Sequence, residues 1–181
     1  GQIVAIALSN GAARWEGTVS DPRGSTEVER LADVVGTLGV GAREVCAASF
    51  QGRLACFDPV TGTQRWSRAW SARGGVAVDE QGVIGVDVRS QVGAFTREGG
   101  AGVWRNDKLS GRGLGAPAVV RGAVVLADGQ GYVHFLSRAS GDPIARTRPD
   151  SNPITAPPRA VGDRVLIQTQ GGAVVLLASG R

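Results

Sequence analysis

The sequence has no methionine, one histidine and two cysteines among its 181 residues. Two cysteines are too few for a disulfide framework, and with a single histidine they are too few for a zinc site. No apolar run approaches the ~20 residues that a membrane-spanning helix requires. These absences exclude a disulfide-stapled miniprotein, a zinc protein and a helical membrane protein.

Negative charge is also in short supply, with 16 acidic against 20 basic residues and a formal net charge of +4. Lys108 is the only lysine, and the arginines are spread along the chain rather than clustered. A nucleic-acid-binding protein concentrates its basic residues in one patch, so this class is not expected. The chain begins inside an apolar stretch without a methionine, and we expect a piece of a longer protein.

Glycine is abundant, with 28 copies, and it marks an internal repeat. Four segments share an apolar strand, a turn with glycine, and a bulky or apolar residue four positions later. The turn glycines are spaced 51, 38 and 41 residues apart, and they are Gly11, Gly62, Gly100 and Gly141. The residues four positions after them are Trp15, Trp66, Trp104 and Ala145.

The spacing predicts an all-β fold of propeller blades, because four short antiparallel strands in ~40–45 residues are the period of a propeller blade. Strands that are apolar on both faces suit blades packed between neighbours. We name the strands of a blade A to D from the centre outward. The predicted units are a partial blade with strands C and D at 1–17, an inter-blade loop with a short helix at 18–36, full blades at 37–68, 75–105 and 116–147, and a partial last blade at 157–181.

The repeated tryptophans are interpreted as packing between blades, early on the outermost strand. Cys46 and Cys56 are interpreted as buried residues of adjacent strands. A two-residue turn at Gln51-Gly52 pairs Ala47 with Cys56, which puts the two cysteines on opposite faces and predicts free thiols. A three-residue turn would instead pair the cysteines directly.

The longest departure from the repeat falls between residues 20 and 35. Thr26 and Glu29 have the spacing of a capping box, which predicts one or two helical turns over residues 27–33. Such an insertion either contacts a partner or forms a lid over the gap between blades. Because D-to-A and B-to-C loops emerge on one face of a propeller, Arg30, Asp33 and Arg112 are the candidate partner-binding residues.

Several of these segments resemble the family of the outer-membrane protein assembly factor BamB. They are the loop GSTEVERLADV at 24–34, GYVHF at 131–135 and VLIQT at 165–169, together with the broader quinoprotein-type repeat at 57–66. The resemblance covers the whole chain, which would match the C-terminal half of a family member.

The resemblance implies an eight-bladed propeller on the periplasmic side of the outer membrane, held by a lipid anchor upstream of residue 1. It implies a non-enzymatic scaffold of the machinery that inserts β-barrel proteins, without a cofactor or metal. The implied partner is the POTRA region of the barrel-forming subunit BamA, with other machinery subunits and unfolded outer-membrane proteins as further contacts. The family's acidic contact pair falls on Asp33 and on Val35, which carries no carboxylate, and its Leu-x-Leu-Arg contact stretch would precede residue 1.

Two other functions compete with this one. The first is a general propeller module for periplasmic peptides or glycans. The second is a quinoprotein dehydrogenase, which needs a metal-binding carboxylate cluster beside its cofactor. The sequence scatters its carboxylates over separate turns, and His134 is expected on strand C at a blade interface or rim, so we expect no enzyme. The scattered carboxylates are Asp58, Asp79, Asp128 and Asp163.

Overall fold

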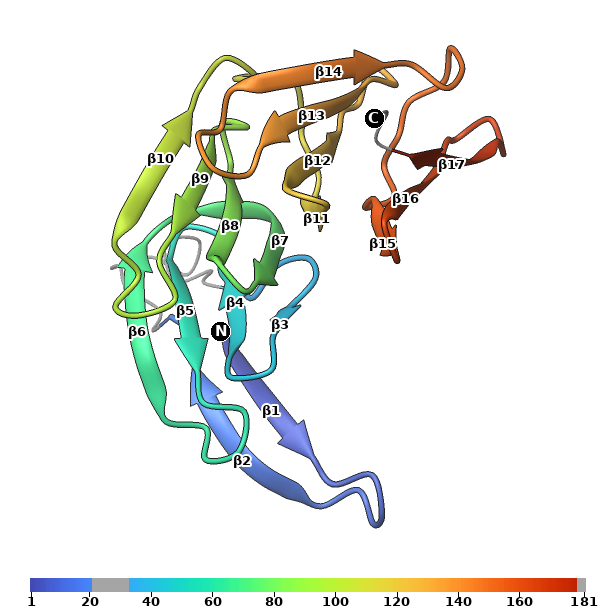
Figure 1. The fold of residues 1–181 in the computed structure, drawn as a ribbon. Helices are drawn as coiled ribbons and strands as arrows, with labels where there is room; N and C mark the ends of the chain where they lie inside the picture. Colours follow the sequence, from blue (N-terminus) through green and yellow to red (C-terminus); the bar gives the residue numbers. More distant parts are fainter. Residues whose placement is uncertain (21–32, 179–181) are drawn as a thin grey trace, which may run out of the picture.

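The structure, a computed structural model, describes residues 1–20 and 33–178, and the regular secondary structure in them is all β-strand. The strands form five antiparallel sheets that follow one another along an arc (Figure 1). The predicted all-β class and the propeller architecture are confirmed. None of the described residues lies in a helix long and apolar enough to cross a membrane.

The strands pair in chain order within every sheet. The first sheet holds β1 (Gln2–Ile6) and β2 (Ala13–Thr18). The second holds β3 (Gly39–Val40), β4 (Val45–Ala48), β5 (Arg53–Phe57) and β6 (Gln64–Ala69). The third holds β7 (Ala72–Asp79), β8 (Gly82–Asp87), β9 (Val92–Phe95) and β10 (Gly102–Asn106). The fourth holds β11 (Ala118–Val120), β12 (Ala123–Ala127), β13 (Val133–Ser137) and β14 (Pro143–Thr147), and the fifth holds β15 (Arg159–Val161), β16 (Arg164–Gln168) and β17 (Val174–Ala178).

Each four-stranded sheet points its first strand toward the centre of the arc and its last strand toward the rim (Figure 1). The middle strands are buried along their whole length in β8 and β12, because sheets pack against both of their faces. This explains why these segments are apolar throughout rather than alternating.

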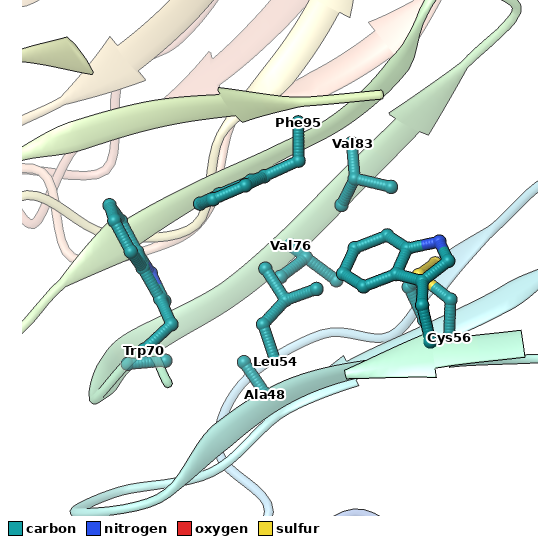
Figure 2. Close-up of a cluster of buried hydrophobic side chains, with 10 residues drawn as sticks. Ala48, Leu54, Cys56, Trp70, Val76, Val83 and Phe95 are labelled. Atoms are coloured by element: carbon teal, nitrogen blue, oxygen red, sulfur yellow. A yellow bond between two sulfur atoms is a disulfide. The ribbon is translucent and has the colours of Figure 1, made fainter. Parts of the chain in front are cut away.

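The core lies between consecutive sheets, and Figure 2 shows the cluster between the second and third. Leu54 of β5 and Val83 of β8 are fully buried there, and Phe95 of β9 meets the ring of Trp70 edge-on at 5.1 Å between centroids. Full burial of such side chains contributes about 1.5–3 kcal/mol each. Packing between sheets, rather than within one, therefore holds the arc together.

The prediction of free thiols was wrong. Cys46 and Cys56 lie directly opposite each other on β4 and β5 and form a disulfide, and both are fully buried (Figure 2). The cause is the length of the turn. The Ser49 N–H donates to the Arg53 carbonyl at 2.9 Å, so residues 50–52 form the turn, and Gln51 takes a left-handed backbone with φ of 52°.

The helix expected over residues 27–33 lies outside the described residues, apart from Asp33. The end of this linker runs beside the edge of the second sheet. The Phe50 N–H donates to the Asp33 carbonyl at 2.9 Å, and the Val35 N–H donates to the Ala48 carbonyl at 2.9 Å. The linker therefore reaches the turn after β4 before it enters β3.

Consecutive sheets are joined by a repeated contact between tryptophan and glycine. The indole N–H of Trp66 donates to the Arg97 carbonyl at 2.8 Å, and its ring covers Gly100, where a Cβ would lie 2.3 Å from the ring. Trp15 covers Gly62 and Trp104 covers Gly141 in the same way. These glycines have positive φ, so glycine meets both the backbone and the packing requirement.

The same ends of the sheets carry ion pairs that the sequence analysis missed. Glu44, after β3, is buried and accepts from Arg97 of the next sheet at 2.8 Å. Asp79, at the end of β7, accepts two hydrogen bonds of 2.7 Å from the buried Arg138 of the sheet after it. These groups join neighbouring sheets, and we call the end that carries them and the glycine turns the glycine-turn face.

Candidate partner-binding face

The opposite end of the sheets carries the turns between second and third strands and the linkers between sheets. We call this end the loop face. Its turns are residues 49–52, 88–91, 129–132 and 169–173, and its linkers include residues 107–117 and 148–158. Arg112 lies in a linker of this face, and Asp33 contacts its first turn.

A polar residue at the end of each second strand shapes the turn that follows. Asp87 Oδ1 accepts the N–H groups of Arg89 and Gln91, each at 2.8 Å. Ser49 and Thr169 use their hydroxyls at the corresponding places of the second and fifth sheets. These side-chain oxygens accept from backbone N–H groups of the turns in place of backbone carbonyls, so local hydrogen bonds hold the turns.

Asp128 is the most highly connected of these capping residues, and its side chain is completely buried. Its Oδ1 accepts the N–H groups of Gln130 and Tyr132, each at 2.9 Å. Its Oδ2 accepts from Arg112 Nε at 2.7 Å and lies 2.8 Å from His134 Nε2. A buried carboxylate requires such partners, because an unpaired one is strongly penalised.

The environment shifts the pKa values of both Asp128 and His134. Burial disfavours the charged carboxylate, but hydrogen bonds, led by that from His134, hold the pKa of Asp128 below its usual value. Burial also lowers the pKa of His134, and the positive charges of Arg112 and Arg146 add to this against the opposing effect of Asp128. The favoured state is therefore a neutral imidazole that donates to a carboxylate.

The structure does not bring the three sequence-predicted binding residues into one contact. Asp33 is exposed and precedes β3, whereas Arg112 is half-buried and precedes β11, two sheets further along. In the described part of the chain no ion pair joins them, because Arg112 is paired with Asp128. Arg30 lies outside the described residues.

Trp70 is a residue of this face that the repeat did not indicate. It follows β6 and lies over Gly85 and Gly93 of the next sheet, where added Cβ atoms would contact its ring. It lines a groove of about 530 Å³ together with Gln51, Asp87 and Arg105, and the Arg105 guanidinium lies 5.5 Å from its ring centroid. Because Trp70 falls outside the four-residue spacing from a turn glycine, the sequence pattern gave no reason to select it.

The capping residues were also missed, although a signal existed. Ser49, Asp87, Asp128 and Thr169 recur 38, 41 and 41 residues apart, the spacing of the repeat itself. Within the described residues there is no group of three or more His, Cys, Asp or Glu side chains that could hold a metal ion. The Asp87 and Asp128 carboxylates of this face thus accept hydrogen bonds from turn N–H groups and pair with arginines.

Comparisons with known proteins agree with this architecture. The family model described as outer membrane protein assembly factor BamB matches residues 1–106 and 88–180. A quinohemoprotein alcohol dehydrogenase from Comamonas testosteroni has a TM-score of 0.58 at 19% identity over 75% of this chain and 22% of its own, a likeness of fold alone.

Individual family members match the chain from end to end. BamB of Burkholderia pseudomallei is 44% identical over 174 residues, which are 96% of this chain and 46% of that protein. The crystal structure of BamB from Moraxella catarrhalis has a TM-score of 0.88 at 31% identity, covering 97% of this chain and 52% of that one. The chain therefore spans about half the length of the relatives it matches. It belongs to the BamB family of outer membrane protein assembly factors.

Proposed function

We propose that the protein is a non-enzymatic scaffold in outer membrane protein assembly, and that its loop face binds the POTRA region of BamA. The observation that carries this proposal is the position of Asp33. This residue matches the first member of the family's acidic contact pair, is exposed, and lies where its carbonyl accepts from Phe50 of the first loop-face turn.

The division of work between the two faces supports this choice of surface. On the glycine-turn face, Glu44 and Asp79 are paired with arginines of the next sheet, and the tryptophans cover the glycines. These groups already stabilise the packing of neighbouring sheets, so they are not available to bind a partner. The loop face carries the linkers, which vary in length without disturbing the sheets and so suit recognition.

The proposed location is the periplasmic side of the outer membrane, with a lipid anchor in the full-length protein, and the disulfide supports the periplasmic part of this proposal. Disulfides form and persist in oxidising compartments such as the periplasm and are rare in the cytosol. Cys46 and Cys56 are both consumed by this bond, so neither of them carries the lipid.

Binding is tested best in the natural full-length protein that carries this chain, by titration calorimetry against the isolated POTRA domains. Asp33→Arg is expected to weaken binding by about 2–5 kcal/mol, the usual cost of losing one member of an interface charge pair. Its melting temperature should be unchanged, because an exposed loop charge contributes little to folding.

Glu98→Arg is the matched control, since Glu98 is also exposed but lies in a turn of the glycine-turn face. It makes the same charge reversal and should bind as the parent does. Equal binding by Asp33→Arg and the parent would show that the contact site is elsewhere. Absence of any POTRA binding by the parent would reject the proposed partner, and a pull-down from a periplasmic extract would then separate it from a general peptide- or glycan-binding module.

A further inference from the structure

Three arginines surround one tyrosine on the loop face of the fourth sheet. The guanidinium carbons of Arg146, Arg148 and Arg112 lie 4.6, 5.1 and 5.5 Å from the ring centroid of Tyr132. The ring is half-buried, while Arg146 and Arg148 are exposed. We call these four residues the arginine–tyrosine cluster.

The members of the cluster come from three segments: the turn after β12, β14 with the linker that follows it, and the linker before β11. Tyr132 follows the turn after β12, Arg146 lies opposite His134 on β14, and Arg112 is anchored by its bond to Asp128. Arg148 starts the linker after β14 and donates to the Ser151 carbonyl at 3.1 Å.

A glycine brings this linker against the turn. Gly131 has a φ of 85°, and a Cβ on it would lie 2.3 Å from the Asn152 carbonyl oxygen and 3.5 Å from Arg148 Nε. Any other residue would push the linker, and Arg148 with it, away from Tyr132. The cluster is thus built by backbone constraints and not by chance orientation of surface side chains.

Positive charge in the cluster exceeds the negative charge near it, which comes from Asp128 and from Asp150, a carboxylate of the same linker that interacts electrostatically with Arg148. Asp128 is shared between Arg112 and His134. Among the described residues, neither Arg146 nor Arg148 has a carboxylate within 4.0 Å. Two exposed guanidiniums with no carboxylate close by, gathered with a third around one ring, favour an anionic partner, because like charges repel one another.

We infer that the arginine–tyrosine cluster is a recognition site for a carboxylate-bearing segment of a protein partner. This inference rests on the proposed function in that it names a surface through which the scaffold engages an assembly partner. The planar fork of arginine matches a carboxylate in two parallel hydrogen bonds. The Tyr132 ring attracts the guanidiniums to one place through cation–π contacts and can supply apolar contact for the chain that carries the carboxylates.

The backbone around the cluster favours a carboxylate over a phosphate. Phosphate sites commonly use free N–H groups of a loop or helix start. Here the backbone N–H groups of Gln130 and Tyr132 are already donated to Asp128, so the donors left for a ligand are side-chain groups, chiefly the guanidiniums. The flanking turn residues 129–131 carry no further cation, so the site is too small for an extended polyanion.

The test uses fluorescence anisotropy with the full-length protein and a fluorescein-labelled peptide of alternating glutamate and serine. The double variant Arg146→Gln/Arg148→Gln is expected to weaken binding about tenfold or more, since each charged hydrogen bond contributes well above a neutral one. A peptide with glutamine in place of glutamate should not bind. Affinity of the parent should fall as salt is raised.

The matched control is Arg14→Gln/Arg159→Gln, which removes two exposed arginines from β2 and β15, outside the cluster. It should keep the affinity of the parent. An equal loss in this control would overturn the inference, because binding would then follow net charge. Binding to phosphatidylglycerol vesicles that depends on Arg146 and Arg148, without binding of the glutamate peptide, would also overturn it.

Calorimetry of the same double variant against the POTRA domains separates this inference from the proposed function. Loss of both peptide and POTRA binding supports the site and places POTRA on it. Loss of peptide binding alone supports the site and assigns it to another assembly partner. Unchanged peptide binding overturns the inference, whatever Asp33→Arg does to POTRA binding.

Discussion

Trp66 contributes to stability both through its ring and through its N–H group. The side chain is only 7% exposed, its ring covers Gly100, and its N–H donates to the Arg97 carbonyl. Trp66→Ala is expected to lower the free energy of unfolding by about 3–5 kcal/mol, the usual cost of deleting a buried aromatic ring. Urea unfolding followed by circular dichroism measures this change.

Trp66→Phe is the informative control, because it keeps an aromatic ring at this position but loses the hydrogen bond and the second ring of the indole. Leaving the carbonyl unpaired should cost about 1–3 kcal/mol, less than the alanine variant. If Trp66→Ala unfolds at the same urea concentration as the parent, the ring does not join the second and third sheets.

The disulfide gives a second prediction at the scale of single residues. Thiol titration of the unfolded, unreduced protein should detect no free sulfhydryl, because Cys46 and Cys56 are bonded. The double variant Cys46→Ala/Cys56→Ala should lose about 2–3 kcal/mol of unfolding free energy, since the bond closes a short loop of the unfolded chain. Detection of two thiols before reduction would contradict the structure.

At the scale of elements, we expect the stability of the turn after β12 to depend on pH through His134. Burial is the main cause that lowers the pKa of this imidazole below its ordinary 6.5. The unfolded state therefore binds a proton before the folded state does, so this contribution to stability is complete above pH 6.5 and is lost as the pH falls below it. Denaturant unfolding at pH 7 and at pH 5 measures the loss.

His134→Gln should flatten this dependence, because glutamine can still donate to Asp128 but does not titrate. The control is Val60→Ala, at an exposed apolar position in the glycine turn of the second sheet, which should leave the slope unchanged. Parallel curves for His134→Gln and the parent would show that another group titrates in this range.

The elements that were predictable from the sequence are those fixed by local chemistry. Turn glycines with positive φ, such as Gly62 and Gly100, mark the strand ends, and the spacing between them indicates the blade. The register after β4 was missed because Gln51, a residue that rarely adopts a left-handed backbone, does so here. The Glu44–Arg97 pair was missed because its members are 53 residues apart and meet only when two sheets pack.

At the scale of the site, the sequence predicted which face carries Asp33 and Arg112 but not how they are arranged. Arg112 was selected for a charge patch shared with Asp33, whereas its own partner is Asp128 on the adjacent turn. The cluster around Tyr132 was not expected at all. It depends on Gly131 drawing the linker of Arg148 against the turn, and that approach depends on how a linker folds back over the sheet it has just left.

At the scale of the whole molecule, the two faces have different roles. The glycine-turn face joins the sheets through Trp66, Glu44 and their repeats, and the loop face is assigned to partners. Hydrogen exchange of the full-length protein, with and without the POTRA domains, tests this division most directly. We predict added protection on binding in loop-face residues 49–52, 88–91 and 129–132, and none in the glycine turns at 58–63, 96–101 and 137–142. Protection confined to the glycine turns would contradict it.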